Sequence, residues 1–199
     1  MNERPILFSG AMVRAILAGK KTQTRRVVKP QPVEDPPGYL IYTDRRGLES
    51  GTFVKDAGWW LNCPYGDIGD RLWVRETLRC AQDGTWYYAA DKAALFVREQ
   101  DAARAAAWAH HKEGDVCTSI HMHRWASRLT LEIVNVRVEP LQNIGEIDAM
   151  HEGCELPPDS PRNYRRAFRA LWDSINAKRG YGWDDDPWVW VIEFRRVQP

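Results

Sequence analysis

Residues 128–138 constrain the fold more than any other stretch of this sequence. Apolar residues first fill odd positions and then even ones, in the order Leu129, Leu131, Ile133, Val134, Val136 and Val138. Successive side chains of a strand point to opposite faces, so a change of parity indicates a bulge or bend within one strand. Such a strand is typical of a small barrel that turns a corner.

The other expected elements are short, and strands do not alternate regularly with helices. We expect strands over 22–28, 71–77, 85–90 and 188–197. A first helix should be capped by Ser9 and ended by Gly19, a second should cover 145–152, and a third should start with Ser160 as its cap. The sequence therefore predicts an α+β fold, built around a PUA-like small antiparallel or mixed β-barrel with short flanking helices and long loop insertions.

Two stretches interrupt this plan. Residues 30–66 are rich in Pro, Gly and scattered charge, and favour a long surface loop in which Trp59 and Trp60 form a lid or pack the loop down. Residues 91–116 are rich in Ala and mixed in charge, which favours an exposed helix or an insertion. We expect residues 1–199 to form a single domain with these two insertions.

Composition excludes several classes of protein. Charged residues make up 28% of the 199 and the formal net charge is +1, so any attraction to nucleic acid must be local. The four cysteines, Cys63, Cys80, Cys117 and Cys154, form no Cys-x-x-Cys pair, and His121 with His123 is a weak metal signal. No apolar run approaches the roughly 18 residues of a membrane span. We expect a cytoplasmic protein with no cofactor, no metal and no membrane contact.

The densest local charge lies between residues 14 and 29. Six cations and no acid occur there, namely Arg14, Lys20, Lys21, Arg25, Arg26 and Lys29. This cluster is either a solvated basic face or a site that holds phosphates. A lysine beside Thr22 and Thr24 favours a site, because a lysine whose pKa is lowered by burial and by neighbouring cations can activate a hydroxyl.

Several motifs together resemble a known family. They are the turn Ile-Leu-Ala-Gly-Lys-Lys-Thr-Gln-Thr-Arg-Arg at 16–26, Gly-Asp-Arg-Leu-Trp-Val at 69–74, the alternating strand, Asp-Ala-Met-His-Glu-Gly at 148–153 and the closing Trp-Val-Ile-Glu-Phe. They look like the ASCH domain, a member of the PUA-like group of small β-barrels associated with RNA. The sequence as a whole, including Ser-Ile-His-Met-His-Arg-Trp-Ala-Ser-Arg at 119–128, is especially similar to the sequences of ASCH proteins of tailed phages and prophages.

The resemblance implies a site. A bacterial amidohydrolase of that family removes the acetyl group from acetylcytidine with a lysine, a threonine and a glutamate, which match Lys21, Thr24 and Glu152. It implies RNA or a modified nucleoside as the partner, with the remaining cations of the turn, Lys20, Arg25 and Arg26, around the ligand. Arg25 stands where the small enzyme has an apolar residue. Without the resemblance, Glu152 would be interpreted as an exposed carboxylate at a helix end.

Three residues outside the turn are further candidates for nucleic-acid contact. Trp125 with Arg124 offers an aromatic face beside a guanidinium, as in single-strand recognition, although a core indole is the ordinary alternative. Arg75 follows an alternating strand and, with Glu76, is either directed into the barrel mouth or part of a surface pair. Other functions stay open at this point: a ribonuclease acting on single-stranded RNA, a non-catalytic reader of a modified base, or a structural phage protein.

Overall fold

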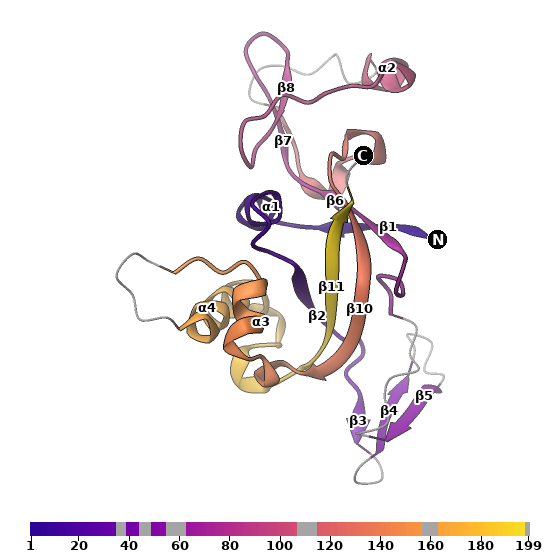
Figure 1. Ribbon diagram of the computed structural model, residues 1–199, viewed down its shortest axis with the longest axis vertical. Helices are drawn as coiled ribbons and strands as arrows, with labels where there is room; N and C mark the ends of the chain where they lie inside the picture. The colour runs from indigo at the N-terminus through magenta and orange to yellow at the C-terminus, as the bar shows by residue number, and fades with distance from the viewer. Residues whose placement is uncertain (35–38, 44–48, 55–62, 107–114, 157–162, 198–199) are drawn as a thin grey trace. The chain divides into compact units, whose positions relative to one another are not determined.

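The structure is a computed structural model that describes residues 1–34, 39–43, 49–54, 63–106, 115–156 and 163–197 (Figure 1). The chain divides into two compact units. Unit 1 comprises Met1–Gly19, Gly69–Glu132 and Arg195–Pro199. Unit 2 comprises Lys20–Ile68 and Ile133–Phe194. The expectation of a single domain stays a prediction.

The α-helices are short, apart from the last. They are α1 Gly10–Leu17, α2 Ala102–Ala106, α3 Glu146–His151 and α4 Tyr164–Asn176. The strands are β1 Glu3–Leu7, β2 Gln23–Val27, β3 Val33–Glu34, β4 Tyr39–Thr43, β5 Glu49–Val54, β6 Arg71–Arg75, β7 Leu78–Cys80, β8 Trp86–Tyr88, β9 Val116–Cys117, β10 Thr130–Pro140 and β11 Trp188–Val197. No helix in the described part of the chain is long and apolar enough to cross a membrane.

The described strands form three sheets. Five pair in the order β1-β6-β10-β11-β2, three in the order β3-β4-β5 and three in the order β8-β7-β9. β1 runs parallel to β6, whereas β6 with β10 and β2 with β11 are antiparallel. The α+β class is therefore confirmed. With β1 and β2 at its edges, the described five-stranded sheet is not closed into a barrel.

Local sequence signals place several elements correctly. The Ser9 side chain accepts a hydrogen bond from the Met12 backbone N–H, and Gly19 ends the α1 segment with a φ of +70°. β11 covers the range expected for the last strand. In β10, Leu131, Ile133 and Val138 are buried, but Val134 is 41% exposed, so only Val138 follows the expected change of parity.

Other expectations differ from the structure. The stretch 30–66 holds the antiparallel strands β3, β4 and β5 and is not simply a loop, whereas Trp59 and Trp60 lie outside the described residues. Part of 91–116 forms α2. The third helix begins at Tyr164, where the Asn163 side chain accepts from the Arg166 N–H and caps it. Ser160 lies outside the described residues.

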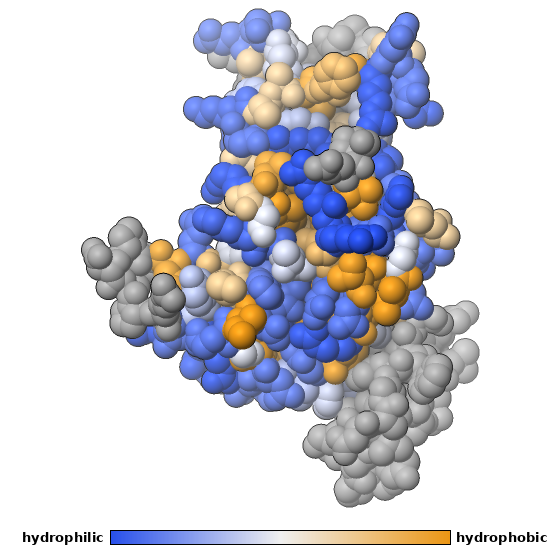
Figure 2. All heavy atoms as spheres, in the orientation of Figure 1, coloured by the Kyte–Doolittle hydropathy of each residue, from blue (hydrophilic) through white to orange (hydrophobic). Residues whose placement is uncertain are grey.

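Each unit has its own hydrophobic cluster. In unit 2, α3, α4 and β11 contribute to a cluster that consists of Leu141, Ile144, Ala149, Phe168, Trp172, Trp183, Val189 and Val191. In unit 1, Leu78, Tyr88, Met122 and Ala126 form a cluster against which Trp125 packs. The surface of the face in Figure 2 is mostly hydrophilic, with smaller hydrophobic areas between.

Candidate functional site

Lys21 is a fully buried cation two residues before β2. Its side-chain exposure is 0% and that of Glu152 is 4%, and the two form an ion pair of 2.8 Å. The Lys21 Nζ also donates to the backbone oxygens of Gln23 and Glu152, each at 2.8 Å. The segment is tied to the end of α3, because the Thr22 N–H donates to the His151 carbonyl. A lysine and a glutamate 131 positions apart thus meet inside unit 2.

Arg25 extends this contact into a network of charges. Its Nη2 lies 2.7 Å from Glu139 Oε1 and 3.1 Å from Asp148 Oδ2, and its Nη1 lies 3.3 Å from Glu152 Oε1. The guanidinium also lies over the Phe168 ring. β2 brings Arg25 to the side of the sheet that α3 and α4 cover, so a residue of the basic turn is buried and surrounded by carboxylates.

A second arginine joins the same carboxylates. Arg137 on β10 donates to Glu139, to Asp148 and, through Nη1, to Glu193. The charge network, defined here as Lys21, Arg25, Arg137, Glu139, Asp148, Glu152 and Glu193, contains three cations and four carboxylates. With every member ionised it carries one net negative charge. Nearby carboxylates therefore compensate part of the positive charge of the basic turn.

Burial changes the proton affinities within the charge network. Loss of hydration lowers the pKa of Lys21 below its ordinary value, and the charge and hydrogen bond of Glu152 oppose this shift only in part. Burial alone would raise the pKa of Asp148, but Gln23, Arg25 and Arg137 hold it below its ordinary value. Lys21 is thus shifted in the direction that a base requires, and Asp148 is kept ionised.

The other residues of the turn have different surroundings. Thr24 is 3% exposed and lies opposite Ile192 of β11. It alternates along β2 with Gln23 and Arg25, so it shares a face of the strand with Arg26. Burial lowers the pKa of the Arg26 guanidinium, while Tyr65 and Glu152 oppose the shift. Lys20 is exposed.

Glu152 is not the exposed helix-end carboxylate that the sequence alone would suggest. It directly follows the last residue of α3, and 4% of its surface is accessible. Both its carboxylate oxygens face cations, Oε2 toward Lys21 and Oε1 toward Arg25. Burying a carboxylate costs several kcal/mol unless cations and hydrogen bonds compensate, which explains why these three side chains occur together.

A pocket of about 360 Å³ opens beside the charge network. It is lined by Thr22, Gln23, Val134, Ile147, Asp148, His151, Glu193 and Phe194. Its walls combine carboxylates with apolar side chains, and no lysine or arginine lines it. We call it the β2–α3 pocket.

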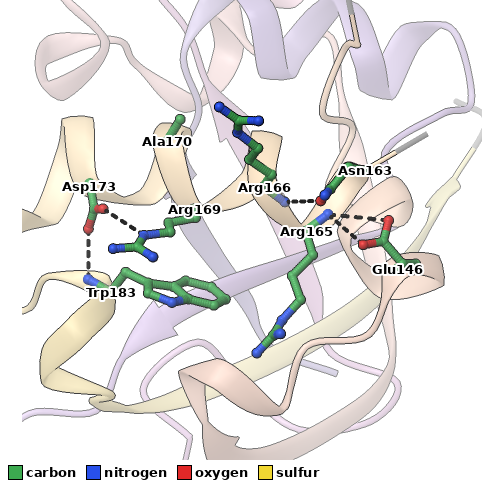
Figure 3. A pocket seen from close by; sticks show the side chains of 8 residues that line it. All are labelled: Glu146, Asn163, Arg165, Arg166, Arg169, Ala170, Asp173 and Trp183. Carbon is green, nitrogen blue, oxygen red and sulfur yellow. Dashed lines mark hydrogen bonds and ion pairs between the residues drawn. The ribbon is translucent and has the colours of Figure 1, made fainter. Parts of the chain in front are cut away.

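A more open pocket of about 650 Å³ lies along α4 (Figure 3). Its lining includes Arg165, Arg166 and Arg169. Arg169 is paired with Asp184 at 2.9 Å, and Arg165 lies over the Trp183 ring. At the start of α4, carboxylate oxygens of Glu146 accept from the N–H groups of Tyr164 and Arg165. These backbone N–H groups, which could otherwise bind an external anion at this helix end, already donate to a carboxylate.

In unit 1, the three predicted nucleic-acid contacts have different partners. Arg75 and Arg124 lie near the same indole, that of Trp73, at 5.2 and 5.9 Å from the ring centroid. Arg75 donates to the carbonyls of Ile120 and Met122, and Arg124 forms a two-point ion pair with Glu3. Trp125 packs against the Leu78 cluster instead. Arg71, Trp73 and Arg75 alternate along one strand and therefore share a face. This pattern could have identified Trp73 as a candidate from the sequence.

Glu76, which the sequence associated with Arg75, is a buried carboxylate of unit 1 that pairs with Arg128. Glu76 is 1% exposed and receives a two-point contact from Arg128, with both distances 2.9 Å. Arg128 also pairs with Asp91 and lies 3.8 Å from the centroid of Tyr88. Burial, with the charge of Glu76, raises the pKa of Tyr88 to about 12. The Tyr88 hydroxyl donates to the Ala126 carbonyl, so we interpret this cluster as structural.

Comparison with known proteins identifies two similar solved structures. An ASCH domain from Lactobacillus crispatus is 11% identical with a TM-score of 0.42, and 98% of this chain aligns with 79% of that one. A DUF984 protein from Enterococcus faecalis is 10% identical with a TM-score of 0.43, and 99% of this chain aligns with 80% of that one. No family model and no curated protein matches the chain. An ASCH domain is thus among the solved structures to which this chain is similar.

Proposed function

We propose that this chain binds RNA or a modified nucleoside next to Lys21 and Thr24, and that it hydrolyses an acylated cytidine. The proposal is based on the resemblance of the turn to that of the ASCH amidohydrolase, and it includes the PUA-like barrel that the resemblance implies. It rests on one observation above all: a lysine with 0% side-chain exposure is held by a buried glutamate, two residues before a strand that carries a buried threonine.

A buried ion pair of this kind is costly and contributes little net stability compared with apolar side chains of similar size. Ionisable groups with perturbed pKa values are concentrated at functional sites. Burial lowers the pKa of Lys21, which is the direction that a general base requires. These properties support a role of Lys21 in proton transfer.

In the proposed reaction, the Thr24 hydroxyl oxygen attacks the acetyl carbonyl carbon while Lys21 accepts the hydroxyl proton. The carbon–nitrogen bond then breaks, and the exocyclic nitrogen leaves with a proton relayed from Lys21. Glu152 orients the Lys21 amine during both transfers. Water hydrolyses the acetyl ester on Thr24, which releases acetate and restores the hydroxyl.

The test is to incubate the purified chain with N4-acetylcytidine and to measure cytidine and acetate by chromatography. Thr24→Val and Lys21→Met should each lower the rate at least about a hundredfold, because general base catalysis contributes about 10²–10⁴. The exposed residues Thr118 and Lys178 provide matched controls, and Thr118→Val and Lys178→Met should retain the rate. Circular dichroism confirms that each variant is folded.

No release of cytidine by the wild-type chain would refute the hydrolytic proposal. A wild-type rate that persists in Thr24→Val would refute the role of Thr24. If acetylcytidine binds without being cleaved, and binding survives Thr24→Val, a non-catalytic reader replaces the enzyme.

A second proposal concerns RNA and rests on unit 1. Trp73 with two neighbouring guanidiniums combines a stacking face with positive charge, as single-strand binding surfaces do. Arg75 has carbonyl partners rather than a carboxylate, so its charge can attract phosphate. Trp73→Leu should weaken binding of a single-stranded oligoribonucleotide, measured by fluorescence anisotropy, by about 1–3 kcal/mol. Equal affinity of Trp73→Leu and the wild type would contradict this proposal.

A further inference from the structure

Gln23, which lines the β2–α3 pocket, has a buried acceptor without a partner in the described part of the chain. Gln23 is 1% exposed and lines the pocket, and its Oε1 has no hydrogen-bond partner among the described residues. The orientation of the amide follows from its other end, because Nε2 donates to the Asp148 carbonyl at 2.8 Å. Rotating the amide would set one oxygen against another. An unpaired buried acceptor costs about as much as a lost hydrogen bond, so Gln23 is suited to a donor from outside the chain.

The charges around the pocket indicate the same kind of ligand. Asp148 and Glu193 line it, and both face Arg137 with one of their oxygens. Among the described residues, these two carboxylates are the charged groups that line the pocket, apart from His151. They would attract a ligand with a positive charge and repel an anion.

The remaining walls set the size and polarity of the ligand. Val134, Ile147 and Phe194 supply apolar surface, and Val134 and Ile147 are 41% and 69% exposed at the opening. A volume of about 360 Å³ is at the small end of the range for ligand pockets. A short hydrocarbon body with one charged nitrogen matches these walls.

We propose that the β2–α3 pocket binds a small primary alkylammonium ion, with its N–H donors toward Gln23 Oε1, Asp148 and Glu193 and its hydrocarbon chain against Val134 and Ile147. This function goes beyond the proposed hydrolysis and does not depend on it. The ligand would complete the hydrogen bonding of Gln23 and neutralise the charge network from outside.

The test uses n-butylamine, which is an ammonium ion at pH 7, and compares it with the neutral 1-butanol. Titration followed by ¹⁵N–¹H NMR should give saturable shifts of the Gln23, Asp148 and His151 amides with n-butylamine alone. Glu193→Gln keeps the size of a side chain that is 35% exposed and removes its charge. It should weaken binding at least about tenfold, since hydrogen bonds to charged groups contribute at least that much.

Two further variants make the result decisive. Val134→Lys supplies an ammonium from the chain itself at the pocket opening, so it should abolish n-butylamine binding. Asp184→Asn removes an exposed carboxylate outside the β2–α3 pocket and should leave the affinity unchanged. The proposal is overturned if n-butylamine gives no saturable shifts, if 1-butanol binds equally well, if Val134→Lys binds like the wild type, or if Asp184→Asn weakens binding as much as Glu193→Gln.

Discussion

Replacing Lys21 by Met should destabilise the protein strongly, and the structure gives the size of the effect. The substitution removes an ammonium that donates to three oxygens at 2.8 Å, two of which belong to the backbone. Of its two described ion pairs, Glu152 keeps the one with Arg25 at 3.3 Å. The net charge of the network changes from one negative charge to two.

Removing one partner of a buried ion pair costs about 3–5 kcal/mol. For a chain of this length each kcal/mol lowers the melting temperature by about 2–4 °C, so a decrease of about 6–20 °C follows. Urea unfolding, followed by tryptophan fluorescence and circular dichroism, measures the free energy of unfolding. Lys178→Met, at an exposed position, is the control and should change stability by no more than about 0.5 kcal/mol.

The double substitution Lys21→Met with Glu152→Gln tests the physical reason. It restores one net negative charge, and the new amide can still accept from Arg25. The double variant should therefore be at least about 1 kcal/mol more stable than Lys21→Met alone, because neighbouring charges are not additive. If the two single effects simply add, or if Lys21→Met costs less than about 1 kcal/mol, the buried pair does not have the energetic role assigned to it.

Three further outcomes follow from the described contacts. The pKa of Lys21, measured by NMR of its Nζ, should lie below 10.5, and a value above that would show that Glu152 outweighs burial. The folded pKa of Asp148 is lowered, so its contribution to stability is present above its unfolded pKa of about 3.8 and is lost as the pH falls through the folded value. Asp148→Asn should flatten the acid limb of urea midpoints, and an unchanged limb would contradict this sign. Asn163→Ala removes the cap of α4 and should cost about 1 kcal/mol in the same assay, whereas no loss would mean that Glu146 suffices as the cap.

The turn at 16–26 shows how far the sequence alone could lead. The sequence alone shows the cations and threonines of the turn. It also shows the resemblance of Lys21, Thr24 and Glu152 to the residues of an ASCH site. It further indicates that neighbouring groups and burial could shift the pKa of the lysine. The sequence suggested a positive field, but the structure surrounds Arg25 with Glu139, Asp148 and Glu152. Those acids lie more than a hundred positions away and could not be assigned to Arg25 from spacing.

The choice among tryptophans has the same explanation. Trp125, next to Arg124, was the evident candidate for stacking, yet it packs in the unit 1 cluster, while Trp73 lies beside the guanidiniums of Arg75 and Arg124. Neighbours in sequence fix only the local direction of a side chain. Which indole faces a cation depends on the pairing of β1, β6 and β10.

The sequence by itself determined the elements whose signals are local: the Ser9 cap, the end of the α1 segment at Gly19 and the range of β11. Capping, glycine conformation and alternation act over a few residues, so they can be read along the chain. Only the tertiary structure decided that Lys21 is buried against Glu152, that Arg25 is neutralised, and that Gln23, which lines a pocket, has a buried oxygen with no partner among the described residues. Burial and charge compensation depend on groups brought together by folding from distant positions, and these are the properties on which the proposed chemistry depends.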